Sequence, residues 1–226
     1  MFFAPTLQAI TNPSAANAVH IICFSTGNAA GIGAIREREL LASASLLGVP
    51  AVNKSVVVHD HPRLPDSMSV AWPEDLIASL MAGSLARLGN RPVDTIITFD
   101  AGGISGHPNH IALLAGARYY INHYPGMQGL SLYSLASVPI YRKYIGVLDA
   151  FVTALLQRDG GSEGGYAGGG GTPKSAMYLS GWREYRAAQR AMTEGHQSQM
   201  VWFRWGWITL SRYMVFNELV LDASRT

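Results

Sequence analysis

The sequence predicts a single layered α/β domain. Short apolar runs alternate with longer stretches of helical periodicity, which is the pattern of strands and helices packed in layers. Hydrophobic residues make up 48% and charged residues 14% of the chain, a composition that favours a packed core over disorder. The 226 residues are enough for one domain with a sizeable core.

The expected elements follow one another along the chain. The first apolar run predicts a strand over residues 18–25. The next helix is expected over 34–47, because Gly48 follows its last apolar position and Pro50 lies just beyond, a common stop signal. The same alternation predicts the remaining elements: strand 55–59, helix 73–88, strand 95–99, helix 109–123, strand 130–137, helix 144–156, strand 176–179 and helix 181–199.

One domain is expected over residues 1–226. Residues 159–173 are rich in glycine and poor in apolar side chains, so we expect them to form a flexible surface loop within that domain. A linker between two domains is disfavoured, because the roughly 50 residues after this loop are mostly helical and would form a poor core alone.

Charge and hydropathy restrict the partners of the chain. A net charge of +2 without a basic cluster predicts no nucleic-acid partner. The sequence has no uninterrupted apolar run of about 18 residues that would predict a spanning helix. Residues 200–220 combine three tryptophans with Arg204 and Arg212, which favour the boundary between lipid head groups and water. This segment either meets a membrane surface or packs as a helix on the core, and the two interpretations stand open.

Residues 26–33 suggest one alternative function. Their sequence, Thr-Gly-Asn-Ala-Ala-Gly-Ile-Gly, follows the first predicted strand and is similar to the dinucleotide-binding turn of short-chain dehydrogenases. Such NAD(P)-binding oxidoreductases need a tyrosine with a lysine four positions later. Tyr141 is followed at that spacing by Ile145, and Tyr185 by Gln189. Residues 51–58 also hold no acidic anchor for the ribose, so we expect a loop that shapes a pocket instead.

A second glycine-rich stretch carries two histidines. Residues 98–110 follow the predicted strand 95–99 and precede the helix that is expected from Asn109. Ligands of open α/β sheets bind at the carboxyl ends of strands. His107 and His110 are three positions apart, so they share one face of a first helical turn and can address the same site. With Asp100 nearby, the pattern favours a metal site over a polar turn with incidental histidines.

These residues, with others, resemble the eukaryotic GlcNAc-phosphatidylinositol de-N-acetylases, which are LmbE-like zinc deacetylases. The run from Thr98 to Leu113 is the strongest match. The likeness covers almost the whole chain in the right order, and its other stretches are 1–6, 23–28, Arg36 with Glu39-Leu40, 47–50, 142–144, Ala191-Met192, His196, Ser198-Gln199, 202–204 and 211–214. The resemblance implies a Rossmann-like three-layer sandwich with a mostly parallel sheet and with zinc at the strand ends.

The family's defining motif, His-Pro-Asp-Asp-Glu, follows its first strand. There, the histidine and the second aspartate bind zinc, and the first aspartate activates the water. Met1 corresponds to a residue just after that motif. The resemblance therefore implies that the first strand, two of the three protein ligands and the base are absent here, and that the zinc site in this chain is incomplete. The stretch 59–61, His-Asp-His, is expected to be pocket wall or surface.

The resemblance also assigns roles to residues that are present. His110 matches the family's later zinc ligand, and His107 matches the histidine that stabilises or protonates the tetrahedral intermediate. Arg36, Asp66 and His196 are expected to contact the substrate.

Two further residues are expected to support the site. Asp100 is expected to orient the histidine loop through hydrogen bonds without binding zinc. Asn109 stands where many bacterial relatives have an aspartate, so a supporting carboxylate is absent there.

The implied activity is zinc-assisted removal of the N-acetyl group from the membrane glycolipid N-acetylglucosaminyl-phosphatidylinositol, the second step of GPI-anchor biosynthesis. The implied location is the cytosolic face of the endoplasmic reticulum membrane. A catalytically inactive, truncated or regulatory form of that enzyme is the main alternative, and the oxidoreductase is the remote one.

Overall fold

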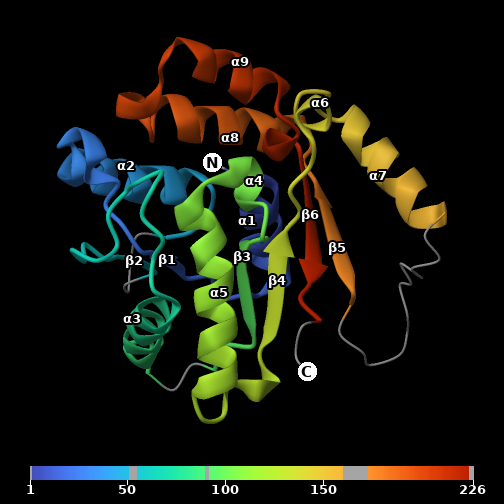
Figure 1. The fold of residues 1–226 in the computed structure, drawn as a ribbon. Coiled ribbons are helices and arrows are strands. Elements are labelled where there is room, and N and C mark those ends of the chain that lie inside the picture. The colour runs from blue at the N-terminus through green and yellow to red at the C-terminus, as the bar shows by residue number, and fades with distance from the viewer. Residues whose placement is uncertain (1, 51–54, 90–91, 160–172, 224–226) are drawn as a thin grey trace.

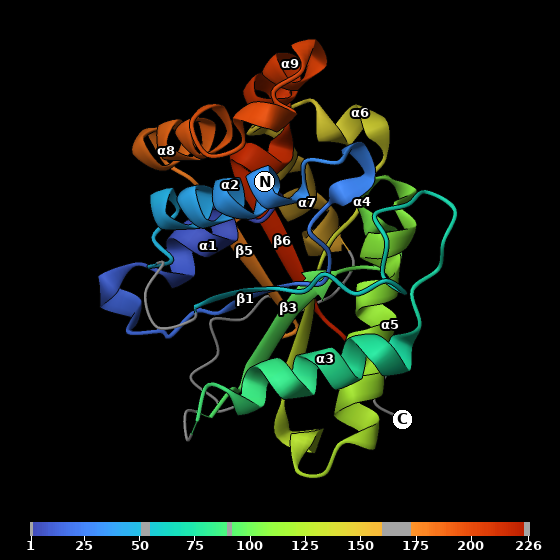
Figure 2. The same ribbon diagram turned by 90° about the vertical axis from the view of Figure 1, so that its left-hand side faces the viewer.

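The computed structural model of the chain describes residues 2–50, 55–89, 92–159 and 173–223. They form an α/β sandwich with helices on both sides of the strands, which confirms the predicted fold class (Figure 1). Helices α3 (Glu74–Ala86) and α5 (Pro108–His123) lie on one side, and α1 (Ala4–Ile10), α2 (Gly33–Leu46) and α8 (Trp182–Thr193) lie on the other (Figure 2).

The described strands form two separate sheets. Strands β1 (Ile21–Cys23) and β2 (Val56–Val58) make a parallel pair. The second sheet has the order β3-β4-β6-β5, in which β3 (Thr95–Phe99) and β4 (Ser131–Leu135) are parallel. Strand β6 (Phe216–Leu221) runs antiparallel to β4 and to β5 (Ser175–Leu179). The carboxyl ends of β3 and β4 therefore meet at one edge, where ligands of such sheets bind.

Further helices and 3-10 turns complete the described chain. They comprise α4 (Gly103–Gly106), α6 (Ile140–Lys143), α7 (Leu148–Asp159), α9 (Trp202–Leu210) and the 3-10 turns η1 (Pro13–Ala15), η2 (Asn28–Ala30), η3 (Met127–Gly129), η4 (Gln197–Gln199) and η5 (Arg212–Met214).

Helices α3 and α5 pack closely against each other. A Cβ at Gly116 of α5 would lie 2.3 Å from Cγ2 of Ile77 in α3. Only a glycine permits this approach.

The structure changes the bounds of two predicted helices. The helix expected over 144–156 begins only at Leu148, as α7, and Gly146, with a φ of 55°, separates it from the short helix α6, which was not predicted. The helix expected over 181–199 ends at Thr193. Gly195 packs against α2 there, and a Cβ on it would lie 2.7 Å from Cα of Ser43. The predicted flexible loop, 159–173, lies mostly outside the described residues and stays a prediction.

The C-terminal quarter contains elements that the sequence pattern did not separate. Strand β6 was not predicted, although it is the centre of the antiparallel part of the sheet. Within residues 200–220, Ile208 is buried, whereas the side chains of Trp202 and Trp205 are exposed. In the part of the chain that the structure describes, we find no helix with the length and apolarity to cross a bilayer.

A buried ion network joins α6 and α7 to η5. Arg142 donates from Nε and Nη2 to the two carboxylate oxygens of Asp149, at 2.6 and 3.1 Å. Arg212 forms a second ion pair with Asp149 through Nη1, and both side chains are fully buried. Burial lowers the pKa of the Arg212 guanidinium, and the charge of Asp149 opposes this shift.

Candidate active site

Asp100 shapes the loop between β3 and α5. Its Oδ1 accepts hydrogen bonds from the N–H groups of Gly102 and Gly103 at 3.0 and 3.1 Å, and its Oδ2 accepts from the N–H of Ser137 at 2.6 Å. The Ser137 hydroxyl donates to Oδ1 at 2.5 Å and accepts from the N–H of Ile104 at 2.8 Å. These bonds hold Ile104 at a φ of 65°, which β-branched residues rarely adopt. Asp100 thus sets the path of the chain into α5.

His107 is the N-cap of α5. Its Nδ1 accepts a hydrogen bond from the N–H of Asn109 at 3.3 Å, and Pro108 occupies the first helical position. Because Nδ1 accepts, the proton of the neutral ring is on Nε2. Nε2 lies 4.0 Å from Oδ1 of Asp66. His107 therefore presents an N–H donor beside a carboxylate.

His110 has the opposite tautomer. Its Nδ1 donates to the carbonyl oxygen of Gly103 at 3.1 Å, which leaves a lone pair on Nε2. The ring stacks on Phe99 with centroids 4.0 Å apart, and it lies 4.8 Å from the ring of His107. Burial lowers the pKa of His110 and keeps the ring neutral. A neutral imidazole oriented by a backbone carbonyl is the form that binds a metal.

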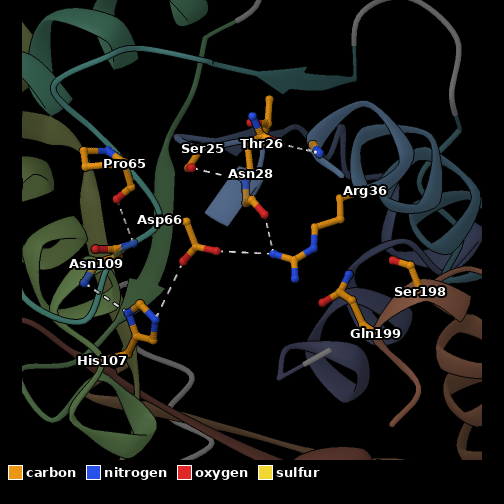
Figure 3. A network of polar contacts seen from close by, with 12 residues as sticks. Ser25, Thr26, Asn28, Arg36, Pro65, Asp66, His107, Asn109, Ser198 and Gln199 are labelled. Atoms are coloured by element: carbon orange, nitrogen blue, oxygen red, sulfur yellow. Dashed lines mark hydrogen bonds and ion pairs between the residues drawn. The ribbon is translucent and has the colours of Figure 1, made fainter. Parts of the chain in front are cut away.

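Asp66 connects His107 to α2. Its Oδ2 accepts a hydrogen bond from Nη1 of Arg36 at 3.2 Å, and its Oδ1 faces His107 (Figure 3). Nη1 of Arg36 also donates to the carbonyl of Gly27 in the loop after β1. The side chains of Arg36, Asp66 and His107 are each 27% exposed, so a polar ligand can reach this line of charges.

Asn109 holds the loop that carries Asp66. Its Nδ2 donates to the carbonyl of Pro65 at 3.4 Å, and the residue is only 5% exposed. This bond ties the start of α5 to the segment between β2 and α3. The structure thus brings together His107, His110, Asp66 and Arg36, with Asp100 and Asn109 as their supports.

His196 lies in a different environment. It is buried after α8, where its Nδ1 faces Nε2 of Gln199 at 3.1 Å rather than Asp66 or His107. The adjoining Ser198 donates from both its N–H and its hydroxyl to the carboxylate of Glu39 at 2.6 Å, which fixes the segment to α2. Burial lowers the pKa of His196 to about 4, and the positive charges of Arg204 and Arg36 add to this shift.

The low pKa of His196 predicts a pH dependence of stability. The unfolded chain protonates this histidine near pH 6.5, whereas the folded chain protonates it only near pH 4. Between these values the unfolded state binds more protons, so the free energy of unfolding should decrease as the pH falls through this window. We expect the decrease to be smaller in His196→Gln, as measured by urea unfolding at several pH values. Equal slopes in the two proteins would contradict the prediction.

A polar cavity of about 250 Å³ opens beside Asp66. Its walls come from the loop after β1, with Ser25, Thr26 and Asn28, and from the loop after β2, with Asp60 and His61. The hydroxyl of Thr26 donates to Oδ1 of Asp60 at 3.1 Å across the two loops.

Residues 26–28 therefore shape a pocket, as the sequence predicts for this glycine turn. No local sequence pattern marks Ser25, Thr26, Asn28 or Asp60 as ligand contacts. The available signal was their position after two neighbouring parallel strands, whose carboxyl ends meet at the same edge.

The described residues do not fit a complete metal centre. His110 offers one lone pair, yet the described parts of the chain contain no group of three or more His, Cys, Asp or Glu side chains that could hold a metal ion. A structural or catalytic zinc needs at least three protein ligands. Zinc binding through His110 therefore needs ligands from elsewhere.

The chain is similar to proteins of known function. Residues 1–121 match the family model described as "PIG-L: GlcNAc-PI de-N-acetylase". The N-acetylglucosaminyl-phosphatidylinositol de-N-acetylase of Arthroderma benhamiae is 38% identical, over 97% of this chain and 82% of that protein. The protein of Bos taurus with the same name is 36% identical, over 97% of this chain and 77% of its own length.

A relative from Schizosaccharomyces pombe, named as a probable enzyme of this kind, is 37% identical over 97% of this chain and 80% of its own length. Among solved structures, a deacetylase triple mutant involved in teicoplanin biosynthesis superposes with a TM-score of 0.56. It covers 98% of this chain and 93% of that one at 13% identity, so it supports the fold alone.

Proposed function

This chain belongs to the GlcNAc-PI de-N-acetylase family, and from that premise we propose that it acts in removing the acetyl group from N-acetylglucosaminyl-phosphatidylinositol. The observation that carries this proposal is the pair of adjacent histidines with opposite tautomers at the end of β3. One ring presents a proton and the other a lone pair, which suits hydrolysis of an amide.

The proposed reaction breaks the C–N bond of the acetamide and joins a water oxygen to the acetyl carbon. Acetate leaves, and the glucosamine nitrogen gains a proton. His107 is proposed to supply that proton, because its Nε2–H lies 4.0 Å from Oδ1 of Asp66 and its side chain is 27% exposed. The same N–H can donate to the oxygen of the tetrahedral intermediate.

We propose that zinc assists this reaction and that His110 is one of its ligands. When bound, zinc would acidify the attacking water and polarise the acetyl carbonyl. Since the described residues provide no three-ligand group, we propose that the other ligands and the water-activating carboxylate come from outside the described residues.

Metal content tests the proposal that His110 is the only zinc ligand among the described residues. We expect the purified 226-residue chain to retain well under one zinc per molecule and to release no acetate, because affinity requires several converging ligands. A protein that combines this chain with the further proposed ligands should carry about one zinc and release acetate. Stoichiometric zinc in the 226-residue chain alone would contradict the ligand proposal, and a zinc-loaded protein of this kind that releases no acetate would contradict the function.

The polar cavity is proposed to hold the carbohydrate part of the substrate. Hydroxyl, amide and carboxylate groups from the two loops match the hydroxyl groups of a sugar or inositol ring. Arg36 is proposed to bind a hydroxyl or the phosphate at the edge of this cavity, since its guanidinium already bridges Gly27 and Asp66.

Replacing Arg36 with methionine is expected to weaken binding of a water-soluble N-acetylglucosaminyl-inositol phosphate roughly 10- to 100-fold, because a charge-assisted hydrogen bond contributes about 1.5–3 kcal/mol. Calorimetric titration of the chain measures this without requiring catalysis. Arg38→Met is the matched control, because Arg38 is an exposed arginine on the same helix. Equal affinities of the two variants for this ligand would show that Arg36 does not contribute to binding.

The proposed substrate is a membrane lipid. We therefore propose a membrane as the place of action, and specifically the cytosolic face of the endoplasmic reticulum that the family resemblance implies. Fluorescence microscopy of the tagged protein against markers of this compartment tests the location.

A further inference from the structure

Helix α7 has its polar and apolar faces reversed. Asp149 and Thr153 face inward and are 0% and 3% exposed. On the outer face, Leu148, Phe151 and Leu155 are 60%, 71% and 62% exposed, at spacings that place them along one stripe. A surface helix in water normally buries its apolar stripe and exposes its polar one. Among the described residues, nothing covers the apolar stripe on the outer face of α7.

Neighbouring helices expose side chains of the same kind. Ile140 and Tyr141 on α6 are 72% and 69% exposed, and Trp202 and Trp205 on α9 are 86% and 55% exposed. With Leu148 and Phe151 we call these residues the apolar rim. They are too many and too large for the scattered apolar residues that a soluble surface tolerates.

The junction of α6 and α7 lies beside the C-terminal end of α9. A Cβ at Gly146, between α6 and α7, would lie 3.6 Å from the carbonyl oxygen of Leu210, the last residue of α9. In both ribbon views, α6 and α9 occupy the end of the molecule opposite the C-terminus (Figures 1 and 2).

The apolar rim also borders the candidate active site. Lys143, the last residue of α6, donates from Nζ to the hydroxyl of Ser105, at 3.1 Å. Ser105 lies in α4, two residues before His107. A ligand anchored at the apolar rim is therefore close to the loop that carries the two histidines.

The chemistry of this surface indicates a phospholipid layer. Tryptophan and tyrosine rings prefer the boundary between head groups and hydrocarbon, because one end of each ring is apolar and the other is polar. The segments 140–156 and 181–213, which include the apolar rim, contain seven Lys and Arg against three Asp and Glu. Arg142, Arg212 and Asp149 pair with one another in the interior, and the remaining charged residues of these segments are five Lys and Arg against two Asp and Glu. The excess positive charge complements anionic head groups.

We propose that the apolar rim docks this chain on the surface of a bilayer that contains anionic phospholipid, with the loop of His107 and His110 beside the lipid head groups. The choice of lipid as the occupant rests on the proposed function, in which the substrate is a phosphatidylinositol glycolipid. The chain then meets its substrate at the membrane surface, and the sugar can enter the polar cavity while the acyl chains stay in the bilayer.

Vesicle binding tests the proposal without hydrolysis. The full chain is mixed with phosphatidylcholine vesicles, with or without phosphatidylinositol, and binding is measured by co-sedimentation and by the blue shift of tryptophan fluorescence. We expect binding that is stronger with phosphatidylinositol and that decreases at high salt. The double variant Phe151→Ser with Trp202→Ser should reduce the partition coefficient at least about tenfold.

The control is Met68→Ser, which removes an apolar side chain that is 66% exposed on the loop between β2 and α3. It should bind vesicles like the original chain. Circular dichroism establishes that each variant is folded, and single substitutions replace the double variant if that one unfolds. Unchanged vesicle binding in the rim variants overturns the proposal, as does concentration-dependent dimerisation, measured by sedimentation, that the rim substitutions abolish.

The same proteins separate this proposal from the proposed function. A rim variant that loses vesicle binding but still binds the water-soluble N-acetylglucosaminyl-inositol phosphate supports the docking surface. A chain that binds vesicles through the apolar rim but does not bind this head group contradicts the proposed function and leaves the docking surface supported.

Discussion

Replacing Asp149 with alanine is expected to reduce the free energy of unfolding by about 3–5 kcal/mol, the range measured when one partner of a buried ion pair is removed. Asp149 is the shared partner of Arg142 and Arg212, and Arg212 is fully buried. A guanidinium does not give up its proton, so Arg212 would retain a buried charge. Its other acidic neighbour is Glu218, at 3.8 Å, a longer contact. Chemical denaturation of the two proteins measures the difference.

Two further variants make this prediction specific. Glu194→Ala removes the partner of Arg190 in an exposed ion pair, and it should leave the unfolding midpoint almost unchanged. Adding Arg212→Met to Asp149→Ala removes the uncompensated charge and should restore part of the lost stability. If Asp149→Ala is as stable as Glu194→Ala, the network does not stabilise the junction of α6, α7 and η5.

The second large effect is expected at His107. In a protein that combines this chain with the further proposed zinc ligands, His107→Ala should lower kcat by about 10²- to 10⁴-fold, because it removes the proposed proton donor. The KM should change little, since Asp66 and Arg36 remain in place. Zinc content should also be unchanged, because the ring of His107 has its proton on Nε2 and is not the proposed ligand.

His110→Ala is the matched comparison, three positions further along α5. It should lower the zinc content as well as kcat, since it removes a lone pair that is oriented by the carbonyl of Gly103. Steady-state kinetics and metal analysis of the two variants separate the roles. The assignment is wrong if His107→Ala loses the metal and His110→Ala keeps it.

Several elements could be predicted from local sequence. The apolar run over Thr95–Phe99 forms β3 as predicted, and the helix expected over 109–123 differs by one residue from Pro108–His123. Apolar periodicity, a proline at the first helical position and a histidine N-cap act within a few residues, so they can be read from the chain alone. The two histidines were therefore expected at the start of a helix beyond a strand, and their place in the fold follows directly from this local pattern.

Other features depend on contacts between distant segments. Asp66 reaches Arg36 and His107 only because the loops after β1, β2 and β3 converge, and no periodicity in the sequence encodes that convergence. The reversed faces of α7 have the same origin, since Asp149 turns inward to meet Arg212 from η5. Strand β6 likewise becomes a strand through pairing with β4 and β5.

The sequence by itself determined the layered class, the order of most elements and the pair of imidazoles at a strand end, because these follow from local propensity and from apolar spacing. Only the tertiary structure decided the tautomer of each histidine, the polar cavity and the exposed apolar rim. Each of these depends on which hydrogen-bond partners and which neighbouring surfaces are brought within contact distance when the chain folds.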